Sequence, residues 1–174
     1  MVAGGDLPGT TRARSLSRPW AAHEPRFLDT NILVYVFDRD EPAKQARATH
    51  LFQGLAEQGT ALLSTQVLQQ FYVVATGRLR SPLTLAEAAT ALEAFARLPV
   101  VTITPGIVPD AARLHRSASV SFWDTLIIQA ALSGGADVLY SEDLQHGRRF
   151  GGLRIENPFL AEQPIDAAEG APNP

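Results

Sequence analysis

The stretch Arg26-Phe27-Leu28-Asp29-Thr30-Asn31, which runs into Ile32-Leu33-Val34-Tyr35-Val36-Phe37, decides the fold of this chain. The apolar pair before Asp29 predicts the end of a short buried strand, and Thr30 and Asn31 are cap-type residues that open an apolar helix. Asp29 therefore stands where a strand passes into a helix. In an open α/β sheet, ligands bind beyond the carboxyl ends of the strands. A simple helix cap would explain Asp29 equally well, so the rest of the chain has to decide.

The composition is that of one globular domain. The chain has 174 residues, of which 45% are hydrophobic and 19% charged, and this length can bury a core without covalent staples. The absence of cysteine excludes a disulfide scaffold, a thiol enzyme and a cysteine-ligated zinc site. No apolar run approaches the roughly 18 residues of a membrane span, and the N-terminus lacks the order of a secretory signal. We therefore expect no membrane association and a cytoplasmic location. The net charge of −3 disfavours a protein that coats nucleic acid through bulk positive charge.

Strand and helix patterns alternate between two tails. Residues 1–24 show no apolar period and predict a disordered tail, and residues 161–174 predict a second tail, which leaves a domain at 25–160. Inside the domain we predict a strand that ends at Leu28, and further strands at 60–63, 100–104, 137–140 and 153–155. The predicted helices start at Thr30 and Pro42 and then occupy 65–79, 84–98, 105–114 and 121–132. This alternation predicts an α/β fold with a mainly parallel sheet covered on both faces.

Three carboxylates fall at the ends of these elements. Asp29 and Asp143 follow predicted strands, and Asp124 lies in the first turn of a predicted helix. Ser121 and Asp124 also match a helix capping box, and this explains Asp124 about as well as a functional role does.

If the sheet brings these ends to one crevice, three negative charges converge there, and such a cluster needs protons or a cation. Carboxylate oxygens suit Mg²⁺ or Mn²⁺, while the lack of cysteine and of paired histidines disfavours zinc. An ion held in this way can bind phosphate oxygens and activate water, which is the chemistry of phosphodiester hydrolysis. The sequence contains no P-loop, G-x-S-x-G, G-x-G-x-x-G or H-E-x-x-H motif that would favour another enzyme class.

Four blocks of the sequence resemble the PIN-domain family, most closely its VapC-like ribonuclease toxins from bacterial toxin–antitoxin modules. The blocks are Phe27-Leu28-Asp29-Thr30-Asn31, Ser64-Thr65-Gln66-Val67-Leu68-Gln69-Gln70-Phe71-Tyr72, Ser121-Phe122-Trp123-Asp124 and Leu139-Tyr140-Ser141-Glu142-Asp143-Leu144. The resemblance covers about residues 25–160. It implies a three-layer α/β/α sandwich, a Mg²⁺ or Mn²⁺ site of acidic side chains and single-stranded RNA as substrate. It also implies a homodimer and a small cognate antitoxin.

The resemblance assigns roles residue by residue. The family's first, third and fourth acids match Asp29, Asp124 and Asp143, and its polar supporting residues match Thr30, Asn31 and Ser64. Where the family has its second acid, this chain has Gln70, an amide without charge. We expect Glu142 to point away from the ion and not to replace that acid. Two functions follow: a metal-dependent endoribonuclease that uses the three aspartates, or a catalytically degenerate PIN-like domain that binds RNA or a partner without cleavage.

Two further predictions concern the surroundings of the crevice. The basic residues His146, Arg148 and Arg149 follow Asp143, and they fit contacts to RNA about as well as a solvated basic loop. Trp123 begins an otherwise apolar helix, so we expect a buried anchor rather than a platform for base stacking.

Overall fold

A six-stranded sheet forms the centre of the molecule. The computed structural model describes residues 24–160, so the two predicted tails, apart from Glu24, lie outside the described residues. The strands are β1 (Arg26–Leu28), β2 (Ala61–Ser64), β3 (Val100–Val101), β4 (Val138–Tyr140), β5 (Arg149–Phe150) and β6 (Leu153–Glu156). They lie in the order β3-β2-β1-β4-β6-β5, and all neighbours are parallel except the antiparallel pair β5 and β6.

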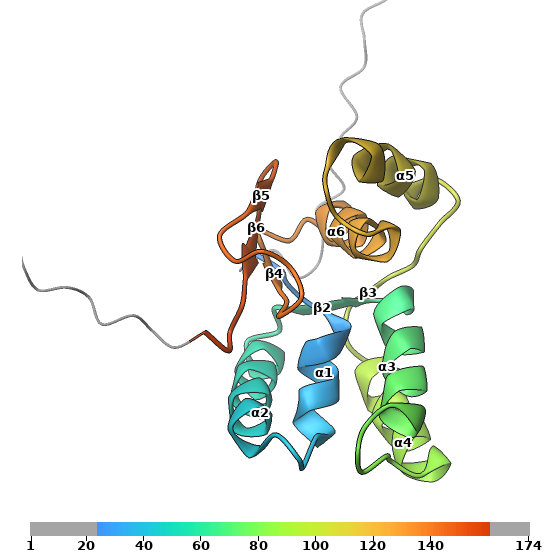
Figure 1. The fold of residues 1–174 in the computed structure, drawn as a ribbon, viewed down its shortest axis with the longest axis vertical. Coiled ribbons are helices and arrows are strands. Elements are labelled where there is room, and N and C mark those ends of the chain that lie inside the picture. The colour runs from blue at the N-terminus through green and yellow to red at the C-terminus, as the bar shows by residue number, and fades with distance from the viewer. Residues whose placement is uncertain (1–23, 161–174) are drawn as a thin grey trace, which may run out of the picture.

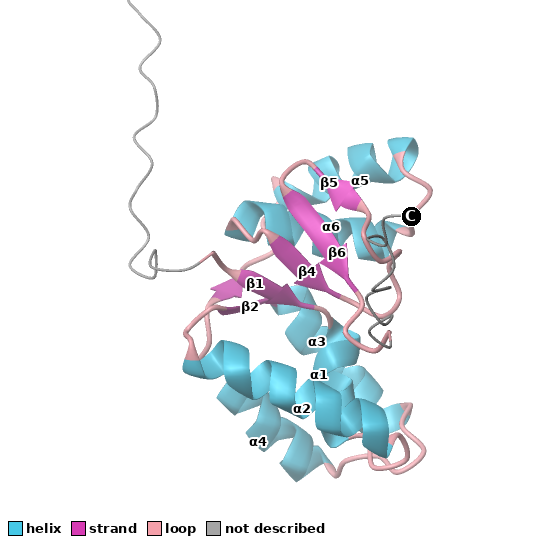
Figure 2. Cartoon of the chain, turned by 90° about the vertical axis from the view of Figure 1, so that its left-hand side faces the viewer, coloured by secondary structure: helices cyan, strands magenta, loops and turns pink. Residues whose placement is uncertain are grey.

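Helices cover both faces of this sheet. They are α1 (Thr30–Phe37), α2 (Pro42–Glu57), α3 (Thr65–Gly77), α4 (Leu85–Phe95), α5 (Ile107–Ser117) and α6 (Phe122–Gly134). Figures 1 and 2 show α1 to α4 on one side of the sheet and α5 and α6 on the other. The predicted three-layer α/β/α sandwich with a mainly parallel sheet is therefore confirmed. None of the described helices is long and apolar enough to cross a membrane.

The middle of the sheet is apolar on both faces, as expected for parallel strands between two helical layers. Phe27 and Leu28 of β1 are fully buried, and so is Leu63 of β2. On the other side of the sheet, Gly134 lets α6 approach closely, because a Cβ atom there would clash with Leu62 and lie 2.9 Å from Cγ2 of Val101. The strand order places β1 between β2 and β4, at the centre of this apolar layer.

Some predicted boundaries differ from the observed ones. The strand predicted at 100–104 ends at Val101, because the chain turns toward α3 and the backbone N–H of Ile103 donates to Oγ1 of Thr65 at 3.1 Å. The next helix begins at Ile107 rather than at residue 105, after a turn. Strand β5 was not predicted. It forms a hairpin with β6 through Gly151-Gly152, a turn for which the positive φ of Gly151 is suited.

Candidate active site

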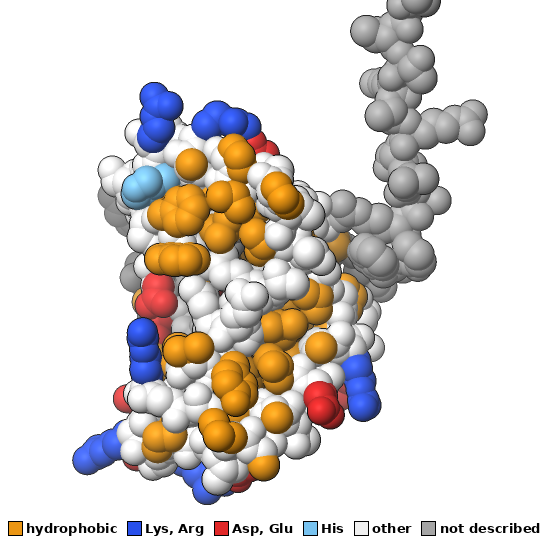
Figure 3. Space-filling view, turned by 90° about the vertical axis from the view of Figure 1, so that its right-hand side faces the viewer, with side chains coloured by type: hydrophobic (Ala, Val, Ile, Leu, Met, Phe, Trp, Pro, Cys, Tyr) orange, Lys and Arg blue, Asp and Glu red, His pale blue; other side chains and the backbone are white. Residues whose placement is uncertain are grey.

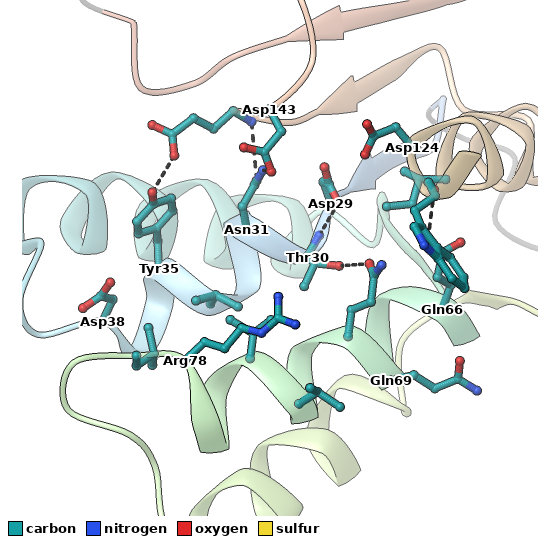
Figure 4. A pocket seen from close by; sticks show the side chains of 18 residues that line it. Asp29, Thr30, Asn31, Tyr35, Asp38, Gln66, Gln69, Arg78, Asp124 and Asp143 are labelled. Carbon is teal, nitrogen blue, oxygen red and sulfur yellow. Dashed lines mark hydrogen bonds between the residues drawn. The ribbon is translucent and has the colours of Figure 1, made fainter. Parts of the chain in front are cut away.

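The carboxyl ends of β1 and β4 place two of the three predicted acids side by side. These strands are parallel neighbours with Leu28 opposite Tyr140, and the N–H of Asp29 donates to the carbonyl of Tyr140 at 3.0 Å. The chain then continues through Ser141 to Asp143. Asp124 reaches the same place from the first turn of α6. Asp29, Asp124 and Asp143 all line one cleft of about 800 Å³ (Figure 4).

Asp29 is both a helix cap and the most buried acid of the cleft, with 4% of its surface exposed. One carboxylate oxygen accepts the N–H of Thr30 at 2.6 Å, and the other accepts the hydroxyl of Ser141 at 2.7 Å. Burial raises the pKa of Asp29 to about 6, although both hydrogen bonds oppose the rise; the negative charges of Asp143 and Asp124 add to it. The two explanations that the sequence left open for Asp29 are therefore compatible.

Asp143 is oriented by polar contacts with β4 and α1. Its N–H donates to the fully buried Ser141 Oγ at 3.2 Å, and Nδ2 of Asn31 donates to its carboxylate at 3.0 Å. Ser141 therefore connects Asp29 and Asp143 through one hydroxyl. Sequence reasoning quoted Ser141 but gave it no role.

Asp124 is bound to the cap of its own helix. Ser121 is the N-cap of α6, and its Oγ accepts the N–H of Asp124 at 3.2 Å and donates to the carboxylate at 2.7 Å. The predicted cap contact is thus present, and the same carboxylate lines the cleft.

Helix α3 forms the opposite wall without contributing an acid. Its lining residues, together with the residue that follows the helix, are Gln66, Gln69, Gln70, Val73, Val74 and Arg78. Oε1 of Gln70 accepts the hydroxyl of Thr30 at 2.8 Å, which places Gln70 beside the strand-to-helix junction of Asp29. Ser64, predicted as a supporting residue, caps α3 instead: its Oγ accepts the N–H of Val67 at 3.3 Å, and it does not line the cleft.

Glu142 is held by a cation and a phenol. Its carboxylate forms an ion pair with Lys44 and accepts the hydroxyl of Tyr35 at 2.5 Å. Partial burial would raise the pKa of Glu142, but the hydrogen bonds from Lys44 and Tyr35 outweigh it and lower the pKa. Glu142 lines the cleft, but these bonds hold its carboxylate at Lys44 and Tyr35.

Trp123 corrects one prediction, because it is 61% exposed and lines the cleft instead of being buried. His146, Arg148 and Arg149 lie elsewhere. His146 accepts the N–H of Asn157, Arg148 lies over the ring of Phe150, and Arg149 begins β5; none of the three lines the cleft.

Sequence reasoning missed Arg78, Gln66 and Gln69 as cleft residues. Gln66 precedes Gln70 by four residues and Arg78 follows it by eight, so helical spacing counted from Gln70 was the signal that could have found these two; no such spacing marks Gln69.

The three aspartates of the cleft have the right ligand atoms for a hard divalent ion, but their side chains are not gathered closely enough to hold one. The acids offer only oxygen ligands, and burial, with a smaller contribution from the charges of Asp143 and Asp124, raises the pKa of Asp29. Within residues 24–160, however, no group of three or more acids or histidines lies close enough together to hold a metal ion as the side chains stand.

The protein is an α/β sandwich domain whose acidic cleft lies at the carboxyl ends of the central strands. The sequence profile of the PIN domain matches residues 26–149, more than half of the chain, and the protein therefore belongs to the PIN-domain family. The membership that the four sequence blocks predicted is confirmed. No curated protein sequence matches the chain.

Solved structures of VapC and VapBC proteins share the fold. Mycobacterium tuberculosis VapC20, described as a toxin that cleaves the sarcin-ricin loop, has a TM-score of 0.52 and 18% identity over 66% of this chain and 86% of its own. VapBC2 from Rickettsia felis, bound to a DNA fragment from their promoter, has a TM-score of 0.51 and 18% identity, and the likeness covers 76% of this chain and 97% of that one. DNA-bound VapBC from Salmonella typhimurium has a TM-score of 0.54 and 22% identity, and the likeness covers 78% of this chain and 99% of that one.

Asp29→Asn should stabilise the metal-free protein at pH 7.5. The pKa of Asp29 rises from 3.8 in its reference state to about 6 in the fold, so the folded state binds this proton more tightly than the unfolded chain does. The resulting stabilisation is complete below the reference pKa and is lost as the pH rises through about 6, a difference on the order of 3 kcal/mol. Asparagine stays neutral, so we expect a free energy of unfolding up to about 3 kcal/mol higher at pH 7.5 and a flatter profile between about pH 4 and 6.

Urea unfolding in EDTA at several pH values measures this effect. Glu93→Gln is the control, because Glu93 is exposed on α4 and is not among the groups that shift the pKa of Asp29. An Asp29→Asn protein that is less stable than the parent at pH 7.5 would contradict the prediction.

Gln70→Glu should strengthen Mn²⁺ binding. A unit charge at about 4 Å contributes about 4 kcal/mol at an effective dielectric of 20, roughly double for a divalent ion, although desolvating and crowding a fourth carboxylate offset much of it. We expect a net gain on the order of 1–3 kcal/mol, or roughly five- to a hundredfold in affinity, and lower stability without metal.

Gln69→Glu is the matched control, because it adds the same charge one residue earlier on α3, where the side chain points away from Thr30 (Figure 4). Calorimetric titration with Mn²⁺ should show a larger gain for Gln70→Glu than for Gln69→Glu. Equal affinity of Gln70→Glu and the parent would show that residue 70 is not beside the ion.

Proposed function

We propose that this PIN-domain protein is a metal-dependent endoribonuclease that cleaves single-stranded RNA and acts as the toxin of a toxin–antitoxin pair. The observation that carries the proposal is the position of Asp29, Asp124 and Asp143 in one cleft at the carboxyl ends of the central strands. The fold likeness to VapC20, a toxin that cleaves the sarcin-ricin loop, supports RNA as the substrate. The cytoplasm is the proposed location.

The three aspartates would hold Mg²⁺ or Mn²⁺. When bound, such an ion supplies a Lewis acid for phosphodiester oxygens and lowers the pKa of a coordinated water. Asp29 would ligate only after losing its proton, so its raised pKa makes ion binding weaken as the pH falls below about 6. Ser141 and Asn31 keep the carboxylates of Asp29 and Asp143 oriented through the hydrogen bonds described above.

A small cognate antitoxin is the proposed protein partner. Two of the structural neighbours are VapBC proteins bound to DNA, and the fold likeness covers nearly the whole length of those chains. A partner of this kind would regulate cleavage by covering the acidic cleft.

A second function has one observation in its favour. With Gln70 in place of an acid, the α3 wall of the cleft carries no carboxylate. A domain that binds RNA or a partner without cleaving it does not need one there. The two functions differ in their need for metal. An ion that binds only the folded protein raises the melting temperature of that protein, so thermal melting can tell the two functions apart.

The chain as given should therefore melt at a higher temperature as Mn²⁺ is added, and should cut single-stranded RNA only with the ion present. Asp29→Asn and Asp143→Asn each remove a proposed ligand, so both should lose cleavage and most of the Mn²⁺-dependent shift while remaining folded. Gel analysis of labelled RNA and thermal melting measure the two effects. Undiminished cleavage by both variants would contradict the mechanism. A melting temperature that does not change up to millimolar Mn²⁺ would favour the non-enzymatic function.

We also propose a homodimer formed through apolar helix surface. Figure 3, which faces the side of the molecule with α3 to α6, shows hydrophobic side chains gathered in two areas with a pale band between them. Among the exposed large hydrophobic residues are Val73 of α3 and Leu85 of α4, with 57% and 67% of their surface exposed. Such clustering on a soluble domain favours association.

Leu85→Glu should shift the protein from dimer to monomer, because it places a charge on the proposed interface. Leu160→Glu, at an exposed leucine that follows β6, should leave the dimer intact. Light scattering at micromolar concentration measures the mass. A monomeric parent would count against the dimer.

A further inference from the structure

Among the described residues that line the cleft, Arg78 is the only lysine or arginine. The acids that line it are Asp29, Asp38, Asp124, Glu142 and Asp143. An RNA strand that enters this cleft brings further negative charge, and the four aspartates, which have no ion pair among the described residues, repel it. Arg78 supplies fixed positive charge inside the cleft.

The backbone of Arg78 is fixed while its side chain is exposed. Arg78 follows the last residue of α3, and its N–H donates to the carbonyl of Val74 at 2.9 Å. The chain beyond it is tied back to the same helix, since the N–H of Leu83 donates to the carbonyl of Ala75 at 2.9 Å. Figure 4 shows the guanidinium group pointing from the end of α3 into the cleft, toward α1. A long side chain on a fixed backbone can follow a ligand group without moving the fold.

The nearby acids bind other partners. Asp38 accepts the N–H of Asp40 at 3.1 Å, Glu142 is paired with Lys44, and Asp143 accepts from Asn31. In the described part of the chain Arg78 takes part in none of the ion pairs. Its guanidinium group therefore keeps its donors available for a ligand that the cleft receives.

We propose that Arg78 is a phosphate-binding residue, which holds a phosphate of the RNA strand beside the scissile position. This inference rests on the ribonuclease function proposed above and adds a substrate contact to it. The planar guanidinium fork donates two parallel hydrogen bonds to phosphate oxygens, which a lysine cannot do. The rest of the α3 wall is uncharged, with Gln66, Gln69 and Gln70, so a strand that lies along α3 meets no carboxylate from that helix.

The experiment compares Arg78→Gln with Arg80→Gln in the full chain. Arg80 lies two residues further on, is exposed and does not line the cleft, so its replacement removes the same charge outside the proposed site. Binding of a fluorescent single-stranded RNA is measured by anisotropy at several salt concentrations, in the Asp143→Asn background so that the strand stays intact. Cleavage is measured separately with Mn²⁺ and without the Asp143 substitution, and thermal melting checks that each variant is folded.

We expect Arg78→Gln to weaken RNA binding about ten- to a hundredfold, as the loss of a charged hydrogen bond does. The slope of log affinity against log salt should fall by about 0.7, the value for one phosphate contact on a single strand. Arg78→Lys should recover part of the affinity, and Arg80→Gln should change little. In the cleavage assay Arg78→Gln should raise KM more than it lowers kcat.

Other results overturn the inference. RNA binding that is unchanged in Arg78→Gln, or weakened equally by Arg80→Gln, would show that Arg78 holds no particular phosphate; cleavage by the parent would then still support the ribonuclease. The opposite result, Arg78-dependent binding by a parent that cuts no RNA, would leave the phosphate contact standing and reject the ribonuclease. A parent that neither binds nor cuts RNA would reject both.

Discussion

The burial of the Asp29 carboxylate between two parallel strands is the constraint on which the site depends. A buried carboxylate is costly unless donors surround it. Here the donors come from both neighbours in the structure, the N–H of Thr30 at the start of α1 and the hydroxyl of Ser141 at the end of β4. They offset part of the cost, but burial, with the charges of Asp143 and Asp124, still raises the pKa of Asp29 to about 6. The fold therefore holds Asp29 in a state that a proton or a cation would relieve.

The sequence was sufficient for features that depend on local signals. A strand followed by an acid and cap-type residues predicted Asp29 and Asp143 at strand ends, and Ser121 predicted the helix start that carries Asp124. Alternating strands and helices predicted the sandwich, and two parallel neighbours then bring strand ends together. The family resemblance assigned Gln70 to the position of the second acid, and that role stays a prediction; in the structure its Oε1 accepts the hydroxyl of Thr30 beside the junction of β1 and α1.

The sequence was insufficient where neighbours come from distant segments. Trp123 was misjudged because α6 is apolar on nearly every side, so its pattern cannot tell which residue of the first turn projects into the cleft. The ion pair of Lys44 with Glu142 joins residues 98 positions apart, and no local pattern signals it. His146, Arg148 and Arg149 follow Asp143 in sequence, but the hairpin of β5 and β6 carries the chain away from the cleft.

The two walls of the cleft differ in charge, and this difference gives Gln70 a physical meaning. Strand ends and α6 supply the aspartates, whereas α3 supplies three amides, with Arg78 just beyond its end. A glutamate at position 70, as the family resemblance would have it, would add a ligand for the ion and also a charge that repels RNA from α3. On the proposed function, an amide there would bind the ion less tightly than a glutamate and would not repel the phosphates of a strand along α3. If the cleft binds an ion and RNA as proposed, the amide at position 70 and the cation at position 78 both favour the strand over the ion on the α3 side of the cleft.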